Sequence, residues 1–128
     1  GIVARAQTGA TNPFRPAGYY FIVDSDGNDF IRVAVYDDAG NWDEIYDPGA
    51  AQTYTLDAWH KFELQVLGDT VTAWWDDTEV FSDTNTDYAS GRIGIVNYMS
   101  GDGSNGTPTY IDRISIEGVT SVEDWSLY

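Results

Sequence analysis

The sequence predicts an all-β chain that folds as an antiparallel β-sandwich or barrel. Apolar and polar residues alternate with a period of two along several short segments, which is the pattern of half-buried strands. Clusters of Asp, Asn, Gly and Ser separate these segments at short intervals, as in chains built from hairpins. No amphipathic helix pattern lies between them, which excludes the alternating strand and helix order of a parallel sheet.

Residues with aromatic and β-branched side chains form most of the predicted strands. These strands are 18–23, 29–36, 59–66, 70–75, 91–98 and 109–117. The alternation is strictest in 59–66, where His60 lies on the apolar face together with Phe62 and Leu64. This placement predicts a structural role for His60, which is the single histidine of the chain.

Short polar connections join the predicted strands. Ser25–Asn28 and Asp38–Asn41 are predicted hairpin loops. Gly68–Asp69 is a predicted two-residue turn, because glycine accepts the positive φ that such turns require. One β-sandwich domain is expected over residues 1–118. Residues 119–128 are expected to form a C-terminal tail, which is a final strand, a linker, or an arm that docks on another molecule.

The composition excludes several classes of partner. The chain has 128 residues, 42% hydrophobic and 15% aromatic, which is enough to bury a core. Acidic residues outnumber basic ones 21 to 6, and the formal net charge is -15. Nucleic acid is therefore not expected as a partner, and neither is an anionic membrane surface. Membrane insertion is not expected, since no apolar run approaches the roughly 18 residues that a membrane helix needs.

The acidic excess also bears on where the protein works. There are 16 Asp and 5 Glu but only one Lys, a balance typical of surfaces that bind water and cations. This balance predicts a secreted, extracellular or cell-surface protein, with a marine or halophilic source as one interpretation. Aspartate in the turns of an ordinary secreted β-protein is the other. Cysteine is absent, which excludes disulfides, thiol nucleophiles and thiolate metal sites.

The sequence does not contain a recognisable catalytic constellation. Glycosidases need two carboxylates about 5 to 9.5 Å apart on one side of a sugar ring. Asp76 and Asp77 are adjacent, so on a strand they are predicted to point to opposite faces. There is no G-x-S-x-G motif and no second histidine for a nucleophilic triad. We therefore expect no catalysis by this chain alone.

The candidate metal ligands are hard oxygens, which favours calcium. Asp24–Asp29 is similar to the start of an EF-hand loop, but the bidentate Glu of that motif would fall at Val35. Asp24 and Asp26 stay as candidate ligands, and a hairpin loop rich in turn-forming residues is the alternative interpretation.

Exposed aromatic residues next to carboxylates predict a sugar-binding surface. A flat ring stacks on the C–H face of a pyranose, and neighbouring polar groups bind its hydroxyls. The candidates are Trp42, Asp43, Tyr46, Trp59, Trp74 and Tyr98. Packing in the core or at a protein interface is the alternative for each aromatic residue.

An ordered set of short motifs resembles the concanavalin A-like (laminin G-like) jelly rolls. The motifs are Trp59–Phe62 (WHKF), Gly68–Val71 (GDTV), Trp75–Asp76, Tyr88–Ile95 (YASGRIGI) and Tyr110–Asp112. The opening Gly1–Arg5 is similar to the G-(I/V)-x-x-R strand of the same domains. Among them, the set is most similar to carbohydrate-binding and accessory domains that lie beside bacterial glycoside hydrolases.

This resemblance implies further features. It implies a jelly-roll sandwich, and a structural calcium ion that Asp112 of the last strand helps to hold. Members of the group carry further strands before the one that Gly1–Arg5 resembles. Their absence here has three explanations: the chain is an excerpt, residues 119–128 fold back as a replacement, or a neighbouring subunit donates a strand.

Together these observations predict a non-catalytic extracellular module that binds carbohydrate or mediates adhesion. Its partner would be a polysaccharide or a surface glycan, held by aromatic stacking. One alternative is a structural subunit of an extracellular filament or surface layer that self-assembles by strand exchange. The other is a fragment of a polysaccharide-degrading enzyme.

Overall fold

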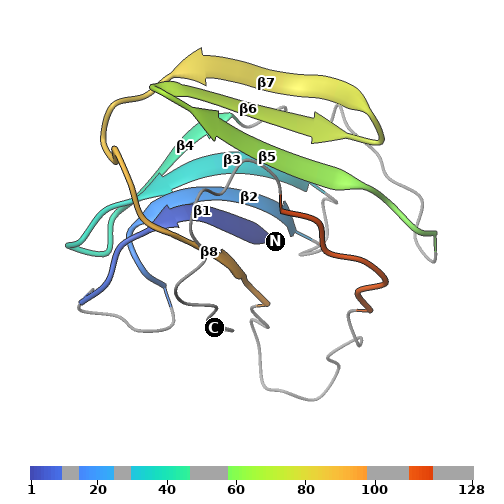
Figure 1. Ribbon diagram of the computed structural model, residues 1–128, viewed down its shortest axis with the longest axis horizontal. Coiled ribbons are helices and arrows are strands. Elements are labelled where there is room, and N and C mark those ends of the chain that lie inside the picture. Colours follow the sequence, from blue (N-terminus) through green and yellow to red (C-terminus); the bar gives the residue numbers. More distant parts are fainter. Residues whose placement is uncertain (10–14, 25–29, 47–57, 98–109, 117–128) are drawn as a thin grey trace.

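Two antiparallel sheets pack face to face as a β-sandwich in a computed structural model of the chain (Figure 1). The structure describes residues 1–9, 15–24, 30–46, 58–97 and 110–116. The described strands are β1 (Ile2–Ala6), β2 (Gly18–Asp24), β3 (Phe30–Tyr36), β4 (Trp42–Tyr46), β5 (Phe62–Leu67), β6 (Thr70–Trp75), β7 (Thr78–Thr84) and β8 (Arg92–Ile95). One sheet has the order β4-β3-β2-β1-β8 and the other β5-β6-β7. This architecture confirms the predicted antiparallel β-sandwich.

Most predicted strands form close to their expected bounds. The segment 70–75 is β6 without change, and 18–23 and 29–36 differ from β2 and β3 by one residue. For the predicted strand 59–66, β5 begins three residues later and ends one residue later, and β8 covers four residues of the predicted 91–98, of which residue 98 lies outside the described residues. The Gly68 turn is confirmed by a φ of 59°. The Asp37–Asn41 loop is held by a hydrogen bond from the Asn41 amide nitrogen to the Asp37 carboxylate at 2.7 Å.

The predicted final strand at 109–117 is wrong for its described part. Residues 110–116 form no strand, and Tyr110, Ile111 and Ile114 are exposed. Their alternation gives them strand propensity, but a strand needs a hydrogen-bonded neighbour, and no described strand pairs with this segment. Asp112 therefore does not lie on a strand.

The strand β7 was not expected from the sequence. The register between β6 and β7 shifts between Ala73 and Trp74, which marks a bulge. Val80 and Phe81 are consecutive, and both pack against the core, so the strand lacks a period-two pattern. The turn before β7 is Asp76–Asp77. It contains neither glycine nor asparagine, the residues by which such a turn is usually recognised in a sequence.

The core side chains between the sheets alternate along β2, β3 and β6, as the sequence predicts. The buried side chains of this core are Tyr19, Phe21, Ile31, Val33, Val35, Val71 and Ala73. Each large apolar side chain that is fully buried contributes about 1.5–3 kcal/mol relative to an exposed one. This layer fixes the two sheets face to face.

A second apolar cluster lies on the outer face of the five-stranded sheet. Val3, Ala6, Tyr20 and Tyr36 are its buried members, and Ile22, Trp42 and Val96 pack against them. Because neighbouring residues of a strand point to opposite faces, Tyr19 enters the core while Tyr20 enters this outer cluster. Burial on both faces explains why residues 18–23 read as a continuous apolar run.

A bulge in β1 connects the two sheets. Its register against β8 shifts between Val3 and Ala6, and Arg5 within the bulge has a φ of 52°. The Arg5 guanidinium donates to the carbonyl oxygens of Tyr88, at 2.5 Å, and Gly68, at 2.6 Å. Gly91 lies against the same bulge, where an added Cβ would be 2.3 Å from the carbonyl carbon of Arg5.

The close approach at Gly91 predicts that Gly91→Ala strongly destabilises the fold. A methyl group at a φ of +156° would overlap the Arg5 backbone, so we expect a loss of more than about 3 kcal/mol in the free energy of unfolding. Gly40→Ala is the matched control, because Gly40 also has a positive φ, +86°, but open space around it. That change should cost about 1 kcal/mol. Equal losses in urea denaturation would contradict the role of the bulge.

Burial of the Gly1 amino group predicts a pH dependence when that group is free. Desolvation lowers its pKa from 8.0 to about 6, while it donates to the Val96 carbonyl oxygen at 2.8 Å. Between these values the unfolded chain binds a proton that the folded chain lacks, so stability rises with pH across this window. The full change is about 2–3 kcal/mol.

Urea denaturation of the chain with a free Gly1 amine, at pH 5.5 and pH 8.5, checks this pH dependence. The His60→Gln variant is the background for the measurement, because it leaves the chain without a histidine. Stability that is equal at both pH values, or higher at the lower pH, would contradict the prediction.

Candidate functional site

The predicted sugar-binding residues lie in separate places on the sandwich. Trp42 and Asp43 open β4 in the five-stranded sheet, whereas Trp74 belongs to β6 in the other sheet. Trp59 precedes β5 and its side chain is exposed. Tyr98 lies outside the described residues. The described candidates therefore form no single common surface.

Trp42 is held in a fixed orientation on the outer face of the five-stranded sheet. Its indole nitrogen Nε1 donates to Glu44 Oε1 at 3.0 Å. Its ring packs edge-on against Tyr36, with centroids 5.2 Å apart, and lies 6.1 Å from Tyr20. The ring is half-buried, so part of it stays accessible. A ring fixed in this way loses little conformational freedom when it binds a ligand.

Charged side chains surround this aromatic group. Arg32 on β3 pairs with Glu44 at 2.8 Å, so one carboxylate oxygen accepts from both Arg32 and Trp42. Arg15 donates to the Tyr36 hydroxyl at 2.8 Å, and its guanidinium carbon lies 5.8 Å from the Tyr36 ring centroid. An aromatic ring edged by hydrogen-bonding groups is the combination that recognises sugars. We call Arg15, Arg32, Tyr36, Trp42 and Glu44 the Trp42 surface.

Trp74 lies on the outer face of the three-stranded sheet. The strand register places it between Glu63 of β5 and Glu79 of β7. Two positions earlier on the same face, the Thr72 and Ser82 hydroxyls are 3.2 Å apart. Trp74 is half-buried, and its cross-strand neighbours Glu63 and Glu79 make its surroundings acidic. This face is a second, separate candidate for ligand contact.

Tyr46 does not lie on the surface with Trp42. It packs against Phe81 of the opposite sheet, with ring centroids 5.7 Å apart. Desolvation in this position raises the pKa of its hydroxyl. The register of β4 against β3 shifts between Val33 and Ala34, and consequently Ile45 and Tyr46 both pack against the core. Tyr46 therefore supports the sandwich interior.

The candidate calcium ligands are dispersed over the chain. Asp24 ends β2, Asp26 lies outside the described residues, and Asp112 is exposed in a segment without strand structure. Within the described ranges, no group of three or more His, Cys, Asp or Glu side chains is arranged to hold a metal ion. Calcium binding stays a prediction of the sequence.

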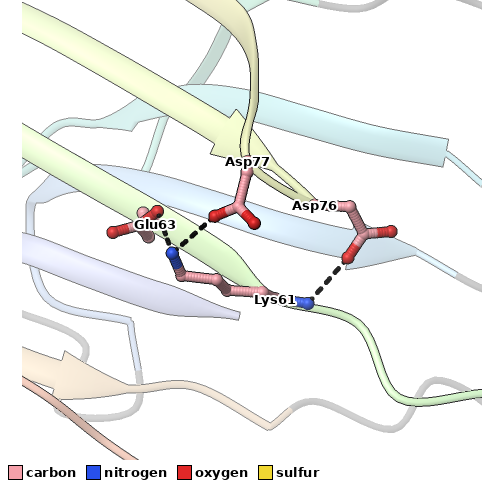
Figure 2. Close-up of polar contacts among 4 residues, drawn as sticks. All are labelled: Lys61, Glu63, Asp76 and Asp77. Carbon is pink, nitrogen blue, oxygen red and sulfur yellow. Dashed lines mark hydrogen bonds and ion pairs between the residues drawn. The ribbon is translucent and has the colours of Figure 1, made fainter.

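A polar cluster that the sequence reasoning missed lies at the β6–β7 hairpin (Figure 2). Asp76 accepts a hydrogen bond from the Lys61 backbone nitrogen at 2.9 Å. The same carboxylate lies 2.8 Å from His60 Nδ1. The Lys61 ammonium group pairs with Asp77 at 2.6 Å and with Glu63 at 2.9 Å. The adjacent carboxylates of Asp76 and Asp77 thus belong to a turn and not to a strand. The signal was available in the W-H and W-D motifs, whose residues meet here.

The electrostatics of this hairpin cluster follow from its hydrogen bonds. The bond with His60, followed by the bond from the Lys61 backbone, lowers the pKa of Asp76. Hydrogen bonds to Asp77 and Glu63 raise the pKa of Lys61. The His60 ring stacks on Trp75 with centroids 4.8 Å apart. A carboxylate that orients an imidazole can support proton transfer, and the same contacts can equally close a hairpin.

The comparison with family models gives one match. The model of the 3-keto-alpha-glucoside-1,2-lyase-like domain matches residues 1–116. The chain belongs to this family. No curated protein and no solved structure matches the chain. The family is sugar-related and its fold is a concanavalin-like β-sandwich, so the predicted carbohydrate-related module is confirmed at that level.

The motifs that lie within this lyase-like domain have structural contacts that explain them. Arg5 of the opening motif bonds to Tyr88 and Gly68, which belong to two other motifs. Gly91 lets β8 approach the Arg5 bulge. His60 and Asp76 join two further motifs by their 2.8 Å contact. These motif residues therefore hold the sandwich together, whereas the Trp42 surface lies outside the motifs.

The hairpin geometry predicts opposite effects for its two aspartates. Asp76 and Asp77 have φ of 47° and 64°. This left-handed backbone conformation costs free energy in residues other than glycine. Asp77→Gly removes only an exposed ion pair with Lys61 and should raise stability by about 0.5 kcal/mol. Asp76→Gly should lower stability, because the contacts to His60 and to the Lys61 backbone are lost.

Thermal and urea unfolding of the two single variants checks this prediction. The two changes relieve the same type of backbone conformation, so each serves as the control for the other. Stabilisation by both, or destabilisation by both, would contradict the distinct role given to Asp76.

Proposed function

We propose that this chain is a non-catalytic carbohydrate-binding domain whose ligand lies on the Trp42 surface. The carrying observation is the Trp42 ring, fixed between Glu44 and Tyr36 and edged by Arg15 and Arg32. Membership of a sugar-related family supports a carbohydrate as the ligand. The aspartate-rich, lysine-poor composition supports secretion to the extracellular space or the cell surface.

The proposed mechanism is stacking combined with hydrogen bonding. The half-buried Trp42 ring takes the C–H face of a pyranose, which removes apolar area of both partners from water. Arg32 and Glu44 are partly exposed beside the ring and supply a donor and an acceptor for sugar hydroxyls. In Figure 1, β2 and β3 bow towards the three-stranded sheet, which makes the outer face that carries Trp42 the concave one.

A catalytic role is the second candidate function. It is favoured by the lyase-like family and by the 2.8 Å contact between His60 Nδ1 and Asp76, which orients an imidazole for proton transfer. Against it stands the position of His60, which stacks on Trp75 at the end of the three-stranded sheet, away from the Trp42 surface. The substrate to test is a 3-keto-α-glucoside, which the family description names.

Glycan binding should depend on the Trp42 ring. Trp42→Ala should weaken binding of the best ligand from a panel of neutral polysaccharides at least about tenfold, which corresponds to 1.4 kcal/mol. Trp42→Tyr keeps an aromatic ring but loses the Nε1 bond to Glu44. Its glycan affinity should therefore lie between those of the unchanged chain and of Trp42→Ala. Trp59→Ala is the control, because Trp59 is exposed elsewhere. Isothermal titration calorimetry measures the affinities, and circular dichroism checks the fold.

Two results would contradict the proposal. Glycan affinity that is unchanged in a folded Trp42→Ala variant would exclude this surface as the binding site. Turnover of a 3-keto-α-glucoside that is lost in both His60→Gln and Asp76→Asn would replace the non-catalytic proposal by the catalytic one.

A further inference from the structure

Six large apolar side chains of the described residues are exposed. They are Trp59 at 70% exposure, Leu67 at 72%, Ile93 at 37%, Tyr110 at 74%, Ile111 at 53% and Ile114 at 54%. Trp59 and Leu67 flank or end β5, Ile93 lies in β8, and the other three belong to 110–116. Single exposed apolar residues are ordinary, but Tyr110, Ile111 and Ile114 are exposed together in one short segment, which indicates that this segment takes part in an interaction.

The sheet topology explains why the sandwich is open beside β5 and β8. Tyr46 of β4 contacts Phe81 of β7, and β5 packs over β1. The three-stranded sheet therefore ends at β5, while the five-stranded sheet continues one strand further to β8. Ile95 pairs with Ile2, which packs against the core, so Ile93, two residues away, also points inward. The inner face of β8 has no opposing strand among the described ones, so the Ile93 side chain stays exposed.

The free edge of β5 is suited to a further strand. Among the described strands β5 pairs only with β6, so the backbone groups of its other edge face outward. A strand added there would lie opposite β8 and cover Ile93. It would need apolar residues at alternate positions on its inner face, and groups that suit Lys61, Glu63 and Gln65 on its outer face.

The segment 110–116 has these properties at every inner-face position except that of Asp112. Tyr110, Ile114 and Ile116 alternate on one face together with Asp112, and Ile111, Arg113 and Ser115 alternate on the other. An antiparallel register that sets Arg113 opposite Glu63 also sets Ile114 opposite Phe62 and Tyr110 opposite Val66. The cationic side chain then meets the acidic one on the outer face, Tyr110 and Ile114 meet the core edge, and Asp112 lies opposite Leu64.

We infer that residues 110–116 of one copy add as a strand to β5 of a second copy, and that the exchange is reciprocal. In the described part of a single chain, residues 110–116 do not pair with the free edge of β5. Each copy carries both the donor segment and the acceptor edge, so mutual exchange closes a two-fold dimer and leaves neither edge open. The interaction needs no carbohydrate and is independent of the Trp42 surface.

A charge swap tests the register. Light scattering across a range of concentrations should show a dimer for the unchanged chain. Arg113→Glu and Glu63→Arg should each raise the dimer dissociation constant at least tenfold, and the double variant should restore it. Ile111→Ser, on the outer face, should change it less than Ile114→Ser, on the inner face. Circular dichroism checks that each variant keeps its strands.

A cysteine pair identifies the origin of the donated strand, because the natural chain has no cysteine. The same register sets Ile111 opposite Gln65, so the Gln65→Cys, Ile111→Cys double variant should form a disulfide-linked dimer under oxidation. A disulfide closed within one chain would overturn exchange between copies. A monomer at all concentrations, an open polymer, or a double charge variant that stays monomeric would also overturn the inference.

Discussion

The Arg5 bulge is the constraint on which the arrangement of the two sheets depends. The backbone of Arg5 is left-handed, and its guanidinium donates hydrogen bonds to the carbonyl oxygens of Tyr88 and Gly68. Gly68 belongs to the turn of the three-stranded sheet, whereas β1 is an inner strand of the other sheet. Charge-assisted bonds to two carbonyl groups offset the backbone cost, and they set how the β5–β6 turn sits over β1.

Much of the fold was predictable because single strands carry their own signals. The bounds of β6 follow from the Gly68 turn before it and from Val71 and Ala73, which alternate into the core. β7 was not predictable, because a bulge breaks its alternation and its turn is Asp76–Asp77. The segment 110–116 shows the opposite error, since it has the pattern of a strand without a partner strand in the described structure.

The candidate site was predictable only in part, for a related physical reason. Trp42 could be found because it follows a turn and opens a strand. Arg32 and Glu44 meet beside it only through the pairing of β3 with β4, and register cannot be read from one strand alone. The shift in that same pairing turns Tyr46 inward, although its spacing from Trp42 favours the surface. The two outer faces also differ, since one is aromatic and largely buried and the other is polar around Trp74.

The position of β1 has a consequence for how the chain folds. The β2–β3 and β5–β6–β7 pairings join neighbours in sequence, so their loops close early and at little entropic cost. β1 instead pairs with β8, and the Gly1 amino group bonds to Val96 at a sequence separation of 95. During synthesis β1 therefore has one open edge until almost the whole domain has left the ribosome. Pairing of such high sequence separation slows folding, and until it forms the unpaired edge of β1 is open to aggregation.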